Sequence, residues 1–120
     1  MKPHVRAAIA YVAGRIATGR QSSSVYDYSG GGHRSIGGSV DRRNVNVYDY
    51  VQGCHLSGNG SGSQFSLYHF GDGHHISLAM NGTSFSGYDY GTGSHFNGNV
   101  SGNSVSLYDY GEGSHFSYSI

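Results

Sequence analysis

Several residue types are scarce in this chain of 120 residues, and each scarcity excludes a class of protein. Tryptophan is absent, proline and cysteine occur once each, and charged residues make up 12% of the chain. The single cysteine, Cys54, cannot form an internal disulfide, so no oxidising compartment is implied. Apolar runs fall short of the roughly 20 residues that a membrane helix needs, and Arg15 interrupts the one segment that resembles a signal peptide. We therefore expect a cytoplasmic protein without membrane attachment.

Net charge is also absent, but the charges are unevenly distributed. All seven basic residues lie in residues 1–43 beside two acids, which gives this part +5. Residues 44–120 carry five acids and no base, which gives −5. A basic segment could bind nucleic acid, but a few solvated arginines are the simpler explanation. We expect no nucleic acid partner.

Glycine and tyrosine, by contrast, are abundant, and the tyrosines recur at a fixed period. The chain has 21 glycines and 11 tyrosines. Tyr-Asp-Tyr motifs begin at residues 26, 48, 88 and 108, and Tyr-His-Phe takes their place at residue 68. A histidine follows every motif at the same distance: His33, His55, His75, His95 and His115. A fixed period of this kind indicates a repeat architecture.

Apolar residues alternate with polar residues between the motifs, which predicts β-strands. Ile76, Leu78 and Met80 share one face of such a strand, as do Val105 and Leu107 of a later one. The Gly-x-Gly segments supply tight turns, because glycine adopts positive φ at little cost. We predict an all-β protein, a single-stranded β-solenoid (β-helix) of about five 20-residue coils stacked roughly 4.8 Å apart.

The N-terminal segment lacks the repeat and has the pattern of a helix over residues 3–18. Pro3 suits the first turn, and Gly19 follows the end. Apolar residues form one stripe along this helix: Val5, Ile9, Val12 and Ile16. We predict that residues 1–22 form an amphipathic capping helix, which covers the first coil of a repeat domain in residues 23–120.

The repeat motif also carries a resemblance. A basic N-terminal helix followed by Tyr-Asp-Tyr-Gly-x-Gly-Ser-His-Phe, as at residues 88–96 and 108–116, resembles a family of short uncharacterised bacterial proteins. The resemblance covers essentially the whole chain but implies no activity. In architecture only, the chain is also similar to bactofilins, bacterial β-solenoid proteins that polymerise end to end, although coil length and motif differ.

The histidine column is the strongest candidate for metal chemistry, since imidazoles on adjacent coils could share an ion. A stacked structural histidine ladder is favoured instead, because metal sites are rarely copied on every repeat. His74, beside His75, is the best local candidate ligand, and His69 interrupts an aspartate column that could pair with the histidines. Cys54 and His55 point to opposite strand faces, which argues against a thiol dyad. We expect no catalytic centre, no metal and no cofactor.

The first tyrosine of each motif forms another column: Tyr26, Tyr48, Tyr68, Tyr88 and Tyr108. An exposed aromatic ladder could bind a carbohydrate or another extended ligand. Stacked rings also stabilise neighbouring strands by about 0.5–1.5 kcal/mol per pair, which explains most of the column without a ligand. A binding module is therefore the alternative hypothesis.

The leading hypothesis is a non-enzymatic structural protein that associates with itself end to end. A last coil that ends in an inward-facing strand would expose unpaired backbone groups, which attract another chain. The charge division favours a filament, whereas the bare edge alone also allows a closed dimer. The predicted contact residues are Phe116, Tyr118 and Ile120 on the last coil and Ala7, Ala10 and Gly14 on the helix.

Overall fold

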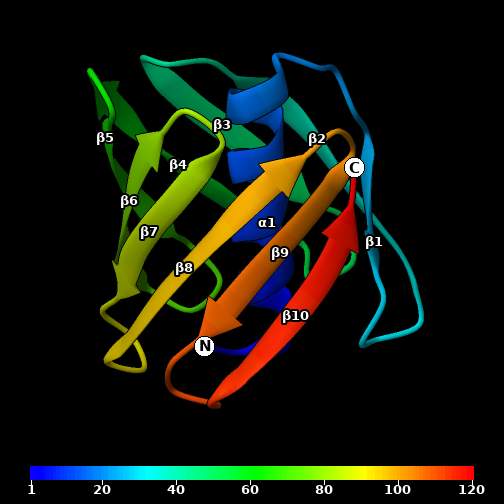
Figure 1. The fold of residues 1–120 in the computed structure, drawn as a ribbon. Helices are drawn as coiled ribbons and strands as arrows, with labels where there is room; N and C mark the ends of the chain where they lie inside the picture. Colours follow the sequence, from blue (N-terminus) through cyan, green and yellow to red (C-terminus); the bar gives the residue numbers. More distant parts are fainter.

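The computed structural model describes residues 1–120, and its elements follow the alternating pattern of the sequence (Figure 1). Inward positions of the strands are mostly apolar and outward positions polar, as period-2 alternation predicts. The helix lies where it was predicted, with Gly19 as its left-handed C-cap. The elements are α1 (Pro3–Thr18), β1 (Ser24–Asp27), β2 (Gly32–Val40), β3 (Asn44–Asp49), β4 (Cys54–Ser61), β5 (Gln64–His69), β6 (His74–Asn81), β7 (Ser84–Asp89), β8 (Ser94–Ser101), β9 (Ser104–Asp109) and β10 (Ser114–Ser119).

Two kinds of glycine turn join most of the strands into antiparallel hairpins. At one end of the barrel three of the four loops have two residues, such as Gly62-Ser63, and Gly62 has a φ of 64°, whereas the β2–β3 loop is Asp41-Arg42-Arg43. Glycine with positive φ at the first loop position is typical of a type II′ hairpin turn. At the other end, Gly53 has a φ of 70° and donates its N–H to the carbonyl of Asp49 at 2.7 Å. Both turns reverse the chain, so consecutive strands pair antiparallel.

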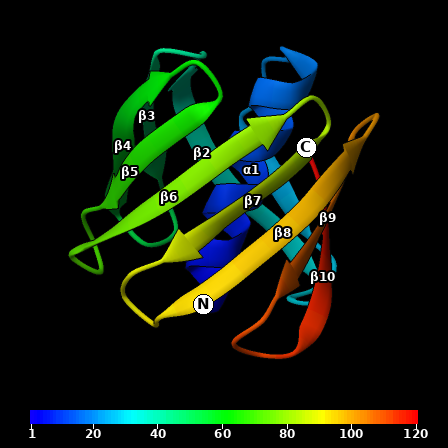
Figure 2. The same cartoon turned by 60° about the vertical axis from the view of Figure 1, so that its left-hand side comes forward.

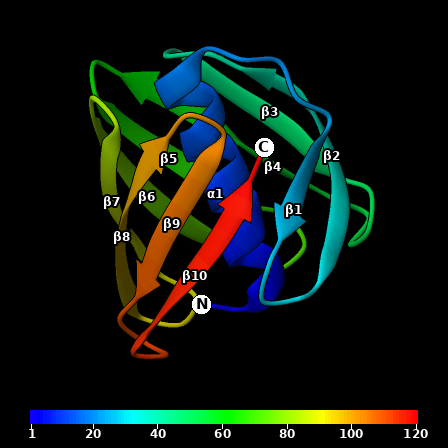
Figure 3. The same cartoon turned by 45° about the vertical axis from the view of Figure 1, so that its right-hand side comes forward.

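The ten strands close into a barrel, which makes the predicted β-solenoid wrong. Each strand pairs with its neighbours along the chain, and β1 pairs with β10, both of which face the viewer in Figure 3. In a solenoid, residues one repeat apart would be parallel neighbours. Here an antiparallel strand lies between them, so that Tyr48 is opposite His55 of its own hairpin. Inward and outward residues alternate in the same way in a solenoid and in a barrel, so this sequence pattern does not distinguish the two architectures.

Helix α1 runs through the lumen of the barrel, between the near and the far strands of Figures 1 and 2. All its residues from Val5 to Ile16 are buried, and it packs against β1, β2, β8, β9 and β10. A barrel of ten strands encloses more space than the eight-stranded barrels that side chains alone can fill. The alanine-rich helix occupies that space, and its residues share one hydrophobic cluster with the strands. The helix therefore fills the barrel and caps no coil, so its predicted capping role is wrong.

Closure of the barrel also removes the predicted surface for end-to-end association. Strand β10 has partners on both sides: the Ser117 carbonyl accepts the N–H of Tyr28 at 3.1 Å, and Ile120 donates to Asn103 at 2.9 Å. The expected contact residues are used inside the chain, where Ala7, Ala10, Gly14 and Tyr118 are buried and Phe116 and Ile120 pack against the core. Without an open edge strand, the physical basis for a filament or an edge-paired dimer is gone.

The tyrosine and histidine columns form a belt around the outside of the barrel. The first tyrosine of each motif is half-buried between two rings: a histidine across the hairpin, at 4.6–4.9 Å between centroids, and the second aromatic ring of its own motif, at 4.8–4.9 Å. These second rings are 56–66% exposed: Tyr28, Tyr50, Phe70, Tyr90 and Tyr110.

This belt corrects two predictions about the columns. Histidines of adjacent repeats, such as His75 and His95, are separated by a tyrosine-bearing strand, hence by two strand spacings of roughly 9–10 Å in total. They form no stacked ladder: His33, His55, His75, His95 and His115 each contact a tyrosine instead. The tyrosines Tyr26, Tyr48, Tyr68, Tyr88 and Tyr108 follow the circumference, so they offer no linear platform for a carbohydrate chain.

Candidate metal centre

The end of the barrel where α1 begins is called the mouth here, and the turns 28–31, 50–53, 70–73, 90–93 and 110–113 surround it. The last inward residue before a mouth turn is an aspartate in four of the five repeats: Asp27, Asp49, Asp89 and Asp109. Its carboxylate accepts backbone N–H groups of the turn, as Asp89 accepts from Gly91 at 2.8 Å. This contact explains structurally why aspartate recurs.

The third repeat has His69 at this position, and the imidazole replaces the carboxylate as acceptor. Its Nδ1 accepts the N–H of Asp72 at 3.1 Å. The other ring nitrogen, Nε2, lies 4.0 Å from Cys54 Sγ. The His69 side chain is buried, so the substitution keeps the turn and adds a nitrogen inside the mouth.

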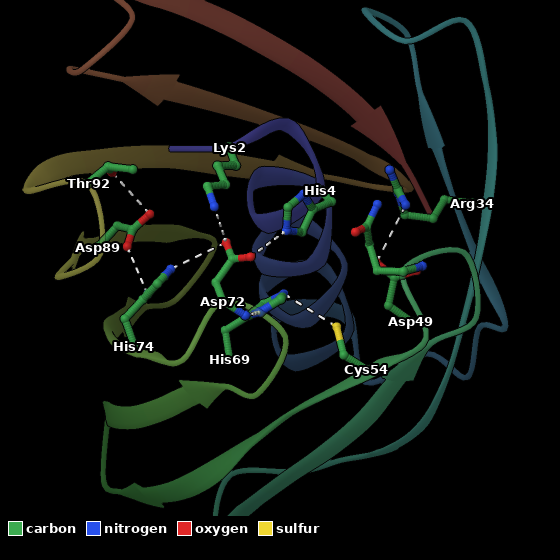
Figure 4. A network of polar contacts seen from close by, with 11 residues as sticks. Lys2, His4, Arg34, Asp49, Cys54, His69, Asp72, His74, Asp89 and Thr92 are labelled. Atoms are coloured by element: carbon green, nitrogen blue, oxygen red, sulfur yellow. Dashed lines mark hydrogen bonds and ion pairs between the residues drawn. The ribbon is translucent and has the colours of Figure 1, made fainter.

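Two positions that vary between repeats bring further side chains to the same point (Figure 4). Asp72 stands where later repeats have Thr92 and Glu112. His74 and Cys54 stand where later repeats have serine, at Ser94 and Ser114. Strands β4, β5 and β6, which carry Cys54, His69 and His74, are consecutive in the barrel wall. Repeated residues have a shared structural explanation, so departures that converge on one place indicate a specific site.

The start of α1 completes the cluster. His4 Nε2 lies 3.2 Å from Asp72 Oδ1, and Lys2 Nζ lies 3.6 Å from Asp72 Oδ2. The rings of His4 and His69 are 5.3 Å apart between centroids. As a result, His4, His69 and Asp72 offer three ligand atoms that all lie within 4.8 Å of one another. This spacing can hold a metal ion.

His74 lies behind these three residues and connects two carboxylates. Its Nε2 is 3.5 Å from Asp72 Oδ2, and its Nδ1 is 3.2 Å from Asp89 Oδ1. The ring also stacks on His69, with an interplanar angle of 18°. Asp72 Oδ2 and His74 Nδ1 are nevertheless buried without a hydrogen-bond partner. Unpaired buried polar atoms are uncommon in folded proteins, and here they adjoin the three candidate ligands.

The electrostatics of the cluster suit a cation. Burial lowers the pKa of His69; the Asp72 carboxylate opposes this shift, and the nearby His4 and His74 add to it. The net lowering favours the neutral imidazole that binds metals. Burial alone would raise the pKa of Asp72, but the hydrogen bond from His4 and the charges of His4, His69 and Lys2 lower it. Burial and the Asp49 carboxylate raise the pKa of the Cys54 thiol.

Two further polar clusters at the mouth are built on ion pairs, and one of them also contains a buried atom without a hydrogen-bond partner, Arg6 Nε. Arg6 donates to Asp109 at 3.2 Å and to the carbonyl of Met1 at 2.6 Å, and its guanidinium covers the ring of Phe116 at 3.7 Å. Arg34 contacts Asp49 at 3.5 Å. Each carboxylate is therefore already matched by a cation.

The predicted site residues and the observed cluster overlap only in part. His74, the best local candidate from sequence, belongs to the cluster, whereas His75 points outward into the belt. Sequence reasoning noted His69 only as an interruption of a column and passed over His4 and Asp72. Comparing the repeats position by position for departures would have identified His69, Asp72, His74 and Cys54 together.

Known proteins do not assist the assignment. Comparisons with protein-family models, curated proteins and solved structures gave no match. The resemblance to a bacterial family stays a prediction. No helix in the structure combines the length and apolar character required for crossing a membrane. The geometry of the mouth is thus the basis for assigning a function.

Proposed function

We propose that this chain binds one divalent transition-metal ion of the Zn²⁺ type at the mouth, with His4, His69 and Asp72 as ligands. The observation that carries the proposal is the convergence of these three ligand atoms within 4.8 Å, at the place where the repeat is broken. Two imidazoles and one carboxylate suit zinc and its neighbours in the first transition series. Calcium and magnesium prefer oxygen ligands throughout, which this set does not supply.

The ligands come from two parts of the fold, which gives the ion a structural consequence. His4 lies in the first turn of α1, whereas His69 and Asp72 belong to the β5–β6 hairpin of the wall. An ion shared by them ties the helix in the lumen to the barrel around it. Because such a site does not exist in the unfolded chain, metal binding adds to the stability of the fold.

Lys2 supplies a positive charge to Asp72 in the absence of the ion. Its side chain is 57% exposed, whereas that of Asp72 is 11% exposed. The ammonium group can therefore turn into solvent when a metal ion takes its place. Little stability is lost, because an exposed ion pair contributes about 0–1 kcal/mol.

We propose a non-enzymatic role for this site. Since Nδ1 of His69 accepts a backbone N–H, the neutral ring carries its proton on Nε2, next to Cys54. In that form His69 has no free electron pair facing the thiol and cannot act as its base. Metal binding through Nε2 requires this proton to move to Nδ1, which ends the contact with the Asp72 N–H.

The test is calorimetric titration of Zn²⁺ into protein that was purified without a histidine tag and stripped with a chelator. We expect saturation at one ion per chain and a higher thermal midpoint in excess Zn²⁺. Asp72→Thr removes the ligand and introduces the residue that occupies the same turn position in the next repeat, Thr92. We expect it to weaken binding by more than about 100-fold.

Glu112→Thr is the matched control, because Glu112 occupies the same turn position in the last repeat. It should bind Zn²⁺ like the wild type. Absence of saturable binding, or equal affinity in the wild type and Asp72→Thr, would overturn the proposal. A loss of binding in both variants would show that the effect is not specific to the cluster, and would overturn it equally.

A further inference from the structure

We infer that Asn81 is a site of spontaneous deamidation in the folded protein, because the turn of the β6–β7 hairpin leaves the nitrogen that must attack it free. The inference goes beyond the proposed function and requires no metal ion. Asn81 ends β6, at the end of the barrel opposite the mouth, and Gly82 follows it. Asparagine is a chemically labile residue, and glycine has no Cβ to hinder the approach of its nitrogen.

The reaction at this position needs only the chain itself and water. The Gly82 backbone nitrogen attacks Cγ of Asn81, and its proton passes through solvent to the side-chain amide, which leaves as ammonia. The product is a cyclic succinimide, and water then opens the ring at either carbonyl. Opening yields aspartate or isoaspartate, whose backbone is longer by a methylene group. Both products carry an additional negative charge, and neither step involves an oxidant or a cofactor.

The chain contains three asparagines that precede a glycine: Asn59, Asn81 and Asn97. All three are exposed, so exposure of the side chain does not distinguish them. The nitrogen of the following glycine does. Gly60 donates its N–H to the Arg43 carbonyl at 2.8 Å. Gly98 lies within β8 and has a paired strand on each side. At both positions the fold must open locally before the nitrogen can attack.

Gly82 differs because it lies in a tight turn outside the strands. Asn81 pairs with Ser84, so that Gly82 and Thr83 form a two-residue loop. Gly82 has a φ of 62°, which is typical of the first position of a type II′ turn. Its N–H donates no hydrogen bond to the backbone, and nothing lies within 4 Å of a Cβ at this position. The nitrogen is therefore free to react without opening of the fold.

The repeat does not require asparagine before this turn. The two neighbouring hairpins at this end of the barrel have serine at the same position, Ser61 and Ser101, each followed by a glycine with positive φ. Serine therefore fits the turn, and it has no amide group that could leave. Asn81→Ser consequently removes the reactive group and keeps a residue that the hairpin accepts.

The test is peptide mass mapping of the folded protein during incubation at mildly alkaline pH, with a second sample unfolded in urea. In the folded protein we expect Asn81 to convert at least about tenfold faster than Asn59 and Asn97, since those two sites react only after local opening. In urea the three sites should convert at similar rates, because glycine follows each of them. Equal rates at the three sites of the folded protein would overturn the inference.

Ion-exchange chromatography provides a second readout, because each conversion adds a negative charge. Asn81→Ser should lose the acidic species that forms first in the wild type. Asn97→Ser is the matched control, since it copies Ser77 and Ser117, and it should keep that species. If the acidic species persists in Asn81→Ser, or if folding protects Asn81 as strongly as Asn97, the inference is wrong. Neither readout depends on Zn²⁺, so metal binding is tested separately.

Discussion

One imidazole can replace an aspartate in a turn and still present a second nitrogen. His69 does so at the mouth: Nδ1 accepts the N–H of the third residue on, Asp72, as the Asp49 carboxylate accepts that of Gln52. The substitution is tolerated by the fold because the turn needs an acceptor and not a charge. A site can therefore arise within a repeat without breaking it.

His74 is the positioning residue of the cluster, since it contacts Asp72 and Asp89 but lies outside the three closest ligands. We expect His74→Ser to weaken Zn²⁺ binding about 10–100-fold, because residues behind a ligand orient it. The metal-free thermal midpoint should stay near that of the wild type, since serine occupies this position in two other repeats. Unchanged affinity in calorimetry would contradict this role.

Tyr118 gives the fold a dependence on alkaline pH. Burial, together with the Asp27 carboxylate, raises the pKa of Tyr118 to about 12. Its unfolded value is about 10, so the native state holds this proton more tightly and stability falls as pH rises from about 10 to 12. The loss from this group is on the order of 2–3 kcal/mol.

Urea unfolding at pH 9 and at higher pH measures this effect, with Tyr118→Phe as the control. The free energy of unfolding of the wild type should fall more steeply with pH than that of the variant, because phenylalanine cannot ionise. Parallel curves for the two proteins would contradict the assignment to Tyr118.

Gly58 allows two strands to approach where a side chain would collide with backbone. A Cβ on Gly58 would lie 2.0 Å from the Ser66 carbonyl oxygen and 2.8 Å from Leu67 Cα. We expect Gly58→Ala to destabilise the barrel by about 1–3 kcal/mol. Gly32→Ala is the control, since nothing lies within 4 Å of a Cβ there, and it should change stability by less than about 0.5 kcal/mol. Equal midpoints in urea would contradict the close approach.

At the scale of the element, helix α1 occupies the lumen of the barrel. Its C-terminal half is held by Arg15, which donates to the Gly38 carbonyl at 2.7 Å and to Gln21 at 2.9 Å. Buried arginine is acceptable here because its donors find acceptors. The helix thus has polar anchors inside an apolar lumen.

Because α1 lies in the centre of the barrel, we expect that the fold does not tolerate a charged residue on the helix face that contains Ala10. Ala10 is fully buried, so Ala10→Asp places an unpaired carboxylate in the core and should prevent folding at neutral pH. Ala17 is only partly buried, and Ala17→Lys near the helix end should be tolerated. Circular dichroism measures both, and a folded Ala10→Asp protein would contradict the central helix.

The elements themselves were predictable, and their arrangement was not. The helix bounds and the inward residues Ile76, Leu78, Val105 and Leu107 follow from local periodicity. A β-solenoid and an antiparallel barrel share that periodicity, so only the turns distinguish the two architectures. Gly62 at the first position of a two-residue loop indicates a type II′ hairpin, which is a signal for antiparallel pairing.

At the scale of the whole molecule, closure brings the two oppositely charged parts of the chain together. Lys2 contacts Asp72, Arg6 contacts Asp109, and Arg34 contacts Asp49. Sequence analysis placed these charges at the two ends of a stack. Only the barrel, with the N-terminal helix inside it, puts them side by side. The candidate site was hidden for the same reason, because His4 is far from Asp72 in sequence.

The central claim is that this barrel holds one metal ion between its helix and its wall. X-ray absorption at the zinc edge, on protein loaded with one equivalent of Zn²⁺, tests it most directly. The account predicts a first shell of nitrogen and oxygen together with the outer-shell scattering of two imidazoles. A first shell of oxygen alone, without imidazole scattering, would contradict it.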